Sequence, residues 1–300
     1  MKHKNEISII NDYIELIDKK LDELMPVTYP QNLFKSMRYT VLLPGKRLRP
    51  VMCLETCRML SGDYEKAIPT ACAIEMLHAQ TLIHDDLPCM DNDDFRRGKP
   101  SNHKIFGEAA AVLAGDALLT YAPQIILKYS NTLSNEVKIK IIEEYLHYAG
   151  AYGVIAGQVT DIESEGKEIT AGSNEVLEYI HEHKTADLFK LSIRSGALIA
   201  DADKNTLAAM TEFAQKLGFA FQIADDVLDV ISDFEKLGKT PGKDKDAGKL
   251  TYVSLYGIDK ALCKISCLFD DCYDILKKQD IKSDVFDEII KGIQKRVRLL

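Results

Sequence analysis

The chain has 300 residues, of which 38 are Lys or Arg and 46 are Asp or Glu, so its formal net charge at pH 7 is −8. This acidic balance argues against a nucleic-acid-binding protein, which usually carries a basic face. Anionic ligands stay open, because a local group of Arg and Lys residues or a bound cation can reverse the field at one site.

The apolar pattern along the chain is helical, with breakers such as Pro26 and Pro44-Gly45 between the periodic segments. The expected helices span residues 10–24, 31–43, 50–60, 64–87, 107–129, 136–164, 174–200, 205–233, 252–278 and 284–298. No set of alternating strands is found. These segments predict an all-α protein, a single-domain bundle of roughly ten helices around a central cavity, a fold that commonly hosts metal sites.

No segment divides the chain or marks it for export or for a membrane. We expect one domain over residues 1–300, and we interpret residues 237–249, rich in Gly and charge, as a mobile loop. The N-terminus leads into a charged amphipathic helix, unlike a signal peptide. Asp116 interrupts the most apolar window, so no membrane span is expected. Seven cysteines without framework spacing favour small core residues in a reduced, cytoplasmic protein.

Two aspartate clusters lie inside apolar helical segments, the first with Asp85, Asp86 and Asp91, the second with Asp225, Asp226 and Asp229. Buried carboxylates must be paired, hydrogen-bonded, protonated or bound to a metal. Asp225 and Asp229 lie one turn apart on one helix face, where a cation between them would remove their repulsion. We therefore favour a metal site over a solvated acidic face.

The first cluster is less regular, because Pro88 disrupts the helix after Asp86. Asp91 needs a local distortion to point where Asp85 does, whereas Asp93 and Asp94 fit a surface salt-bridge patch. Magnesium prefers oxygen ligands and is typically held by one or two carboxylates together with substrate phosphates. Two facing clusters therefore suit magnesium ions that hold a diphosphate between them.

Several polar residues could accompany these clusters. The bases available for phosphate oxygens are Lys46, Arg47, Arg49, Arg96, Arg97, Lys184 (beside Thr185) and Lys239. No P-loop or dinucleotide-binding motif is present. His181 and His183 lack the spacing of a zinc protease and fit the polar face of a helix. Gln158 and Asp161 either line the same cavity or cap a helix, and the sequence leaves both open.

These motifs resemble those of the trans-isoprenyl diphosphate synthases, the polyprenyl synthetase family that includes farnesyl and geranylgeranyl diphosphate synthases. The matching segments run in order along the chain: Gly45 to Pro50, His78, Leu82 to Asp91, Asp94 to Gly98, Leu113 to Asp116, Gly157 to Asp161, His183 to Thr185, Phe221 to Asp229, and Gly238 to Thr240. The resemblance implies an all-α homodimer that condenses isopentenyl diphosphate with an allylic diphosphate.

The resemblance also implies roles for individual residues. Direct magnesium ligands would be Asp85, Asp91 and Asp225, with Asp86 and Asp229 as direct or indirect partners of about three ions bridging to the diphosphate. The allylic diphosphate would be held by Arg96, Lys184, Thr185, Gln222 and Lys239. Isopentenyl diphosphate would be held by Lys46, Arg49, His78 and Arg97. The expected catalytic set is Asp85, Asp86, Asp91, Arg96, Lys184, Asp225 and Lys239.

Product length is expected to depend on Gln80 and Thr81, which meet the growing tail about 5 Å deeper than Asp85, one helical turn away. Farnesyl synthases of this type often carry an aromatic floor at the position of Gln80. We expect farnesyl diphosphate as the product, with geranylgeranyl diphosphate as the alternative.

Three other classes of protein fit the sequence less well. A class I terpene cyclase needs no second diphosphate site, and an HD-type metal phosphohydrolase, suggested by His84 next to Asp85, should have histidine-rich ligands. A catalytically silent partner subunit should have lost some of the aspartates or arginines, whereas this chain keeps them.

Overall fold

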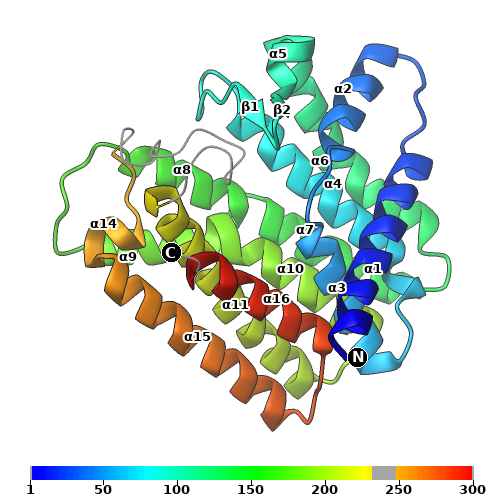
Figure 1. Ribbon diagram of the computed structural model, residues 1–300. Coiled ribbons are helices and arrows are strands. Elements are labelled where there is room, and N and C mark those ends of the chain that lie inside the picture. The colour runs from blue at the N-terminus through cyan, green and yellow to red at the C-terminus, as the bar shows by residue number, and fades with distance from the viewer. Residues whose placement is uncertain (1, 232–247, 299–300) are drawn as a thin grey trace.

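The computed structural model describes residues 2–231 and 248–298, and almost all of their regular structure is helical (Figure 1). The first half of the chain forms α1 (Lys2–Leu24), α2 (Gln31–Val41), α3 (Leu48–Ser61), the 3-10 turn η1 (Glu65–Ala67), α4 (Ile68–Asp85), α5 (Asn102–Phe106), α6 (Glu108–Tyr129), α7 (Asn135–Ala149) and α8 (Val154–Ser164). The second half forms α9 (Ser173–Ile180), the π-helix η2 (His181–Ala186), α10 (Asp187–Ile199), α11 (Lys204–Ile231), α14 (Tyr252–Tyr256), α15 (Ile258–Lys278) and α16 (Asp284–Arg298). The all-α fold class is confirmed.

The strand content of the described residues is one short hairpin, in which β1 (Phe95–Arg96) pairs antiparallel with β2 (Lys99–Pro100). It follows the first aspartate cluster directly. Arg97 and Gly98 form its turn, both with positive φ. The hairpin thus turns two arginines of the expected site back toward the bundle.

Two expected helices are each divided in the structure. The segment 136–164 breaks between α7 and α8, where a Cβ on Gly153 would lie 2.1 Å from the carbonyl oxygen of Tyr148. The segment 252–278 breaks at Gly257, which adopts φ of 80° between α14 and α15. Glycine allows both backbone geometries, because a Cβ would clash at the first and left-handed φ strains other residues at the second.

The expected helix 174–200 is continuous, but its middle turn is the π-helix η2. A π-helical turn inserts one extra residue into an α-helix and is frequent at functional sites. Here it holds Lys184 and Thr185, two residues of the expected site. The apolar period of the sequence did not reveal this insertion.

Two helices, α4 and α10, form the centre of the bundle. Most of the side chains of each are buried. α4 is apolar on nearly every face, as expected of a core helix, whereas α10 also buries polar residues such as Asp187 and Lys190. α4 packs against α6 and α3, and α10 packs against α3 and α11. α16 returns across the bundle to contact α1, α3 and α11 (Figure 1). α4 and α11 carry the two aspartate clusters, so the core itself positions them.

One described helix, α6, is long and apolar enough to span a membrane by length and composition, with a mean hydropathy of 1.5 over its most apolar window. It contains Asp116, and 39% of that window is buried inside the bundle. α6 packs against α4, α2 and α5. Some apolar side chains of α6 are therefore buried in the core, and others lie on a face that the rest of the described chain does not cover.

Candidate active site

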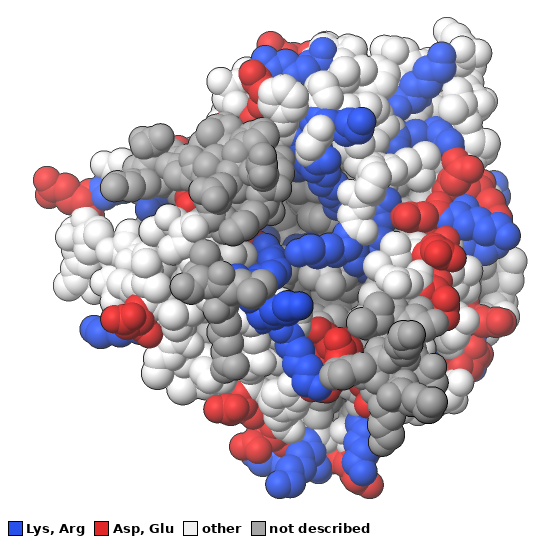
Figure 2. Space-filling view, in the orientation of Figure 1, with Lys and Arg blue, Asp and Glu red and all other residues white. Residues whose placement is uncertain are grey.

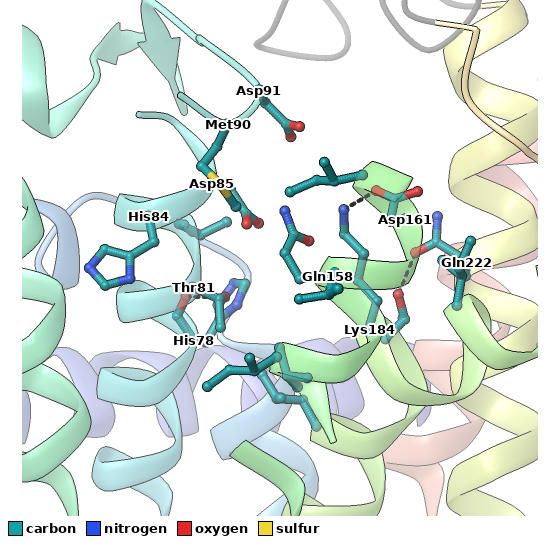
Figure 3. Close-up of a pocket in the computed structure, with 18 of the residues that line it drawn as sticks. His78, Thr81, His84, Asp85, Met90, Asp91, Gln158, Asp161, Lys184 and Gln222 are labelled. Carbon is teal, nitrogen blue, oxygen red and sulfur yellow. Dashed lines mark hydrogen bonds and ion pairs between the residues drawn. The ribbon is translucent and has the colours of Figure 1, made fainter. Parts of the chain in front are cut away.

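A cavity of about 760 Å³ opens between the C-terminal end of α4 and the facing surfaces of α8, η2 and α11. Figure 2 shows Lys and Arg side chains gathered around a hollow on this face of the molecule. In Figure 3, Asp85 and Asp91 lie on one wall, and Gln158, Lys184 and Gln222 face them from the other. Both aspartate clusters contribute to the lining, as the sequence predicts.

The first cluster is shaped by the turn that ends α4. The backbone N–H of Asp91 donates to the carbonyl of Asp85 at 2.9 Å, so the chain folds back on itself after Pro88. Asn92 follows with φ of 49°, a left-handed conformation that Asn tolerates. Asp85 and Asp91 therefore both line the cavity, and the local distortion expected from the sequence is present.

The two carboxylates differ in their electrostatic surroundings. Burial raises the pKa of Asp85, and Asp91 raises it further, although Lys184 acts in the opposite direction. Burial also works to raise the pKa of Asp91, but Lys249 and Lys184 outweigh it and hold that pKa below its ordinary value. Neighbouring cations thus keep Asp91 ionised, while Asp85 would be ionised more readily with a cation beside it.

Asp86 points to a different partner. Arg96 donates from Nε to both Asp86 oxygens, at 2.9 and 3.2 Å, and from Nη2 to Asp93 at 3.2 Å. Asp86 is buried and lies outside the cavity lining, whereas Arg96 lines it. Asp86 therefore positions Arg96, and its expected role as a direct or indirect partner of a metal stays a prediction. Asp93 is also buried, so the surface-patch interpretation is wrong for it; Asp94, exposed and paired with Lys104 at 2.7 Å, fits that interpretation.

The second cluster lies on α11, and its aspartates also differ in whether they line the cavity and in their partners. Asp225 lines the cavity, 3.4 Å from Nη2 of Arg296 on α16. Asp226 also lines it, and accepts from Gln222 at 2.9 Å and from the backbone N–H of Tyr252 at 2.8 Å. His181 approaches Asp226 at 3.3 Å and is buried, so its expected place on a polar helix face is wrong.

Asp229 lies one turn beyond Asp225, buried and outside the cavity lining. Its Oδ1 has no hydrogen-bond partner among the residues that the structure describes. An unpaired buried carboxylate oxygen is costly, and a water or a cation reaching it from the Asp225 side would satisfy it. Its expected role, as a direct or indirect partner of a metal, stays a prediction.

The donor chemistry fits magnesium. Within residues 2–231 and 248–298, no three His, Cys, Asp or Glu side chains converge as a ready-made metal site. Magnesium rarely uses an all-protein cage; it keeps waters and takes one or two carboxylates plus substrate phosphates. Asp85, Asp91 and Asp225 offer carboxylates from two sides of one cavity, and the orphaned oxygen of Asp229 lies one turn beyond Asp225 on α11. These groups would hold such ions only with a phosphate ligand between them.

The facing wall is built by α8 and η2. Lys184 Nζ donates to Asp161, and Thr185 Oγ1 donates to Gln222 at 2.5 Å (Figure 3). Gly157 allows the two segments to touch, because a Cβ there would lie 2.2 Å from the backbone nitrogen of Lys184. Asp161 and Gln158 both line the cavity, which resolves the alternative that the sequence left open.

A second set of bases forms a different kind of anion site. Arg49 and His78 line the cavity, and the buried Nε of Arg49 has no partner in the described part of the chain. Burial lowers the pKa of Arg49 to about 10. Burial, and then Arg49 and Arg97, lower the pKa of His78 far below its ordinary value. This concentration of positive charge, with a spare donor, suits an anion that binds without metal.

Two of the expected bases, Lys46 and Lys239, are not among the described residues that line the cavity, whereas a third lysine, Lys249, lines it. Lys46 is exposed and lies outside the cavity lining, with Arg296 and Asp225 as its charged neighbours. Lys239, like most of the expected loop 237–249, lies outside the described residues. Lys249 lines the cavity and lies 3.1 Å from Asp91 and 3.6 Å from Asp161. It was not predicted, because nothing in the sequence distinguishes Lys249 from the other lysines of that segment.

Below the aspartates the cavity continues between α4, α6 and α8. Gln80 and Thr81 line it one turn from Asp85, as predicted, and Leu119 and Ala149 lie further along. Gln80 Nε2 lies 3.1 Å from His84 Nδ1, and His84 Nε2 lies 3.1 Å from the carbonyl of Val112. The amide of Gln80 is therefore tied to α6 through His84.

Three comparisons agree on what this chain is similar to. Residues 30–291 match the sequence model of a family described as polyprenyl synthetase. A geranylgeranyl diphosphate synthase of Cyanophora paradoxa is 41% identical over 93% of this chain and 92% of its own length. A farnesyl diphosphate synthase of Geobacillus stearothermophilus is 46% identical over 84% of each chain. A geranyltransferase of Helicobacter pylori, solved in complex with magnesium and isoprenyl diphosphate, superposes with a TM-score of 0.84 at 29% identity, covering 98% of both chains.

Proposed function

This chain belongs to the polyprenyl synthetase family, and we propose that it joins isopentenyl diphosphate head to tail with an allylic diphosphate, dimethylallyl or geranyl, in a magnesium-dependent reaction. The observation that carries the proposal is the presence of two differently built anion sites on one cavity. Asp85, Asp91 and Asp225 would hold one diphosphate through a metal. Arg49, His78 and their neighbours would hold the other without one.

In this proposal the first step is ionisation of the allylic C–O bond. About three magnesium ions, bound at Asp85, Asp91 and Asp225, would supply the neutralising charge that makes diphosphate a good leaving group. Arg96 and Lys184 would hold its outer oxygens. Asp86 fixes the direction of Arg96 on one wall, and Asp161 holds Lys184 on the facing wall.

The second step joins the two substrates. The basic pocket would orient isopentenyl diphosphate so that its double bond attacks the allylic cation, and a proton would then pass to the released diphosphate. No side chain has to act as a nucleophile. The lower cavity is lined by apolar residues such as Leu119, Val154 and Ile155, which offer the cation no nucleophile.

We propose farnesyl diphosphate as the main product. Gln80, fixed by His84, places a polar amide on the wall one turn below Asp85. A hydrocarbon tail that passes it must cover polar surface, which costs free energy. A specific observation favours geranylgeranyl diphosphate as the second candidate, because neither Gln80 nor Thr81 is aromatic and the cavity continues to Leu119. Relatives bearing both names match at similar identity, so product length needs an experiment.

The protein is further proposed to be a homodimer that pairs through α6 and α7. Leu113 and Leu127 on α6 and Ile139 and Leu146 on α7 are each more than half exposed. The two α6 residues lie about four turns apart on one side of their helix, and the two α7 residues lie two turns apart. α6 and α7 are in contact, and exposed apolar side chains gathered on adjacent helices commonly mark a protein interface. A second copy is the partner that the resemblance implies.

A cytoplasmic location is proposed on the basis of the cysteines. All seven are unpaired, as a reducing compartment would keep them. Four of them are buried core residues, as expected. The expectation is wrong for Cys89, Cys263 and Cys267, which are exposed.

The test is to supply the purified protein with each allylic diphosphate, with and without isopentenyl diphosphate, and to identify every product. The proposal predicts a longer prenyl diphosphate only when both substrates and magnesium are present. A hydrocarbon formed without isopentenyl diphosphate would indicate a terpene cyclase. Phosphate released from either substrate alone would indicate a phosphohydrolase.

A further inference from the structure

Arg97, at the turn of the hairpin, is held by contacts that the sequence motifs do not explain. Its Nη1 donates to the carbonyl of Leu43 at 3.1 Å, and its Nη2 lies 3.6 Å from Glu75 Oε1. Its backbone has φ of 53°, an unfavourable left-handed conformation for a long side chain. The surrounding structure therefore determines where this guanidinium lies. It is outside the cavity lining, beside Arg49 and His78, which line the cavity.

Gly45 lies against one side of the Arg97 guanidinium. A Cβ on Gly45 would lie 2.7 Å from both Cζ and Nη1 of Arg97, closer than real Cβ contacts come. The obstructing atoms are the far end of a flexible side chain, so an added methyl group would displace the guanidinium and leave the backbone in place. Gly45 thus provides the space in which the Arg97 guanidinium lies against the loop after α2.

Glu75, on α4, faces the same guanidinium from a second direction. Its side chain is almost fully buried, and Oε1 accepts from Arg47 Nη1 at 2.6 Å in addition to facing Arg97. Glu75 also contributes to holding up the pKa values of Arg47, Arg49 and Arg97, each of which burial lowers. A carboxylate placed among three arginines offsets their mutual repulsion while no anion is bound.

The guanidinium of Arg47 is bonded to other groups of the protein and has a structural role. It is buried and bonded to Glu75, to Asp18 at 2.7 Å and to the carbonyl of Leu43 at 3.0 Å. The same carbonyl accepts from Arg97. Glu75, Arg47 and Leu43 therefore fix the loop after α2 relative to Arg97, and they leave Arg49 available to a ligand.

We propose that Glu75 and Gly45 are positioning residues that hold the Arg97 guanidinium beside Arg49 and His78, at the metal-independent diphosphate site, and so set the affinity for isopentenyl diphosphate. This inference rests on the proposed function for the identity of the ligand. It assigns neither residue a contact with substrate. Both act through Arg97, one by charge and hydrogen bonding and the other by leaving room.

The experiment compares Gly45→Ala and Glu75→Gln with Asp18→Asn as the matched control. Asp18→Asn also removes a carboxylate from Arg47, but Asp18 is on α1 and does not contact Arg97. Steady-state rates are measured with each substrate varied in turn. Binding of isopentenyl diphosphate in EDTA is measured by calorimetry, because that site is proposed to need no metal. A charge-assisted hydrogen bond is worth enough for its loss to weaken binding roughly 10- to 100-fold.

We expect Gly45→Ala and Glu75→Gln to raise KM for isopentenyl diphosphate and its Kd in EDTA by that factor, with KM for the allylic substrate within about twofold of wild type. Gly45→Ala should keep the wild-type melting temperature, which separates misplacement of Arg97 from loss of fold. Unchanged Kd in Gly45→Ala overturns the inference, as does an equal rise in both KM values or the same defect in Asp18→Asn. If the wild-type protein forms no condensation product, the proposed function fails by itself, and the calorimetric comparison still decides the positioning role.

Discussion

Gly157→Ala offers the sharpest structural test of how the cavity wall is assembled. The added Cβ would lie 2.2 Å from the backbone nitrogen of Lys184, whereas ordinary contacts begin at about 3.4 Å. The obstructing atom is backbone, so α8 and η2 must separate by about 1.2 Å to admit the methyl group. η2 carries Lys184 and Thr185, so its displacement from α8 would shift both side chains within the site.

The magnitudes follow from this displacement. Overpacking of this kind costs about 1–3 kcal/mol. A chain of this length has an unfolding entropy of about 0.6 kcal/mol/K, so the melting temperature should fall by about 2–5 °C. A misplacement of about 1 Å at a reacting centre can cost about 100-fold in rate. We therefore expect a modest loss of stability with a large loss of kcat.

The assay is differential scanning fluorimetry together with the initial rate of condensation, and Gly292→Ala is the matched control. Gly292 lies in α16 with nothing within 4 Å of an added Cβ, so alanine there should stabilise the protein by up to about 1 kcal/mol. Wild-type kcat in Gly157→Ala would refute the reasoning, since it would mean that the contact between α8 and η2 does not position Lys184. A fall in melting temperature in Gly292→Ala would refute the stability argument.

Three further outcomes are expected. Gln80→Tyr should shorten the main product, read by chromatography, and unchanged length would remove Gln80 as the floor of the tail cavity. Leu113→Glu should convert a dimer into a monomer in light scattering, because it places a charge in the proposed apolar interface; a wild-type monomer would contradict that interface. Lys249→Gln should shift the acid limb of the rate profile to higher pH, because Lys249 holds down the pKa of Asp91 and its removal lets that pKa rise. A shift to lower pH, or none, would show that Asp91 does not control that limb.

Periodicity was sufficient to predict the helices and the two clusters, but it could not predict every interruption. Gly150, Gly153 and Gly257 lie in apolar patterns, and glycine inside a helix costs only about 1 kcal/mol, so its presence alone does not end one. The π-helix at His181–Ala186 gives no sequence signal of its own, because the extra residue does not change the apolar character on either side. Tertiary packing decides both features.

The roles of adjacent aspartates were also beyond the sequence. Asp85 and Asp86 are neighbours in one motif, yet one faces the cavity and the other is bonded to Arg96. The motif assigns Asp226 no separate role, although its carboxylate accepts a hydrogen bond from the backbone N–H of Tyr252 at the start of α14. Neighbouring residues on a helix point about 100° apart, and their partners come from segments distant in the chain. The residue types in the motifs were sufficient to locate the site, whereas the role of each aspartate depends on contacts in the folded structure.

The most direct test of the account follows a label from isopentenyl diphosphate into product. Labelled isopentenyl diphosphate is incubated with the purified protein, geranyl diphosphate and magnesium, and the products are dephosphorylated and separated by chromatography. The account predicts label in farnesol, and none when geranyl diphosphate is omitted or EDTA is added. Label that stays in isopentenyl diphosphate under all conditions would contradict the proposed condensation. Label incorporated equally well in EDTA would contradict the proposed dependence on magnesium at the aspartates.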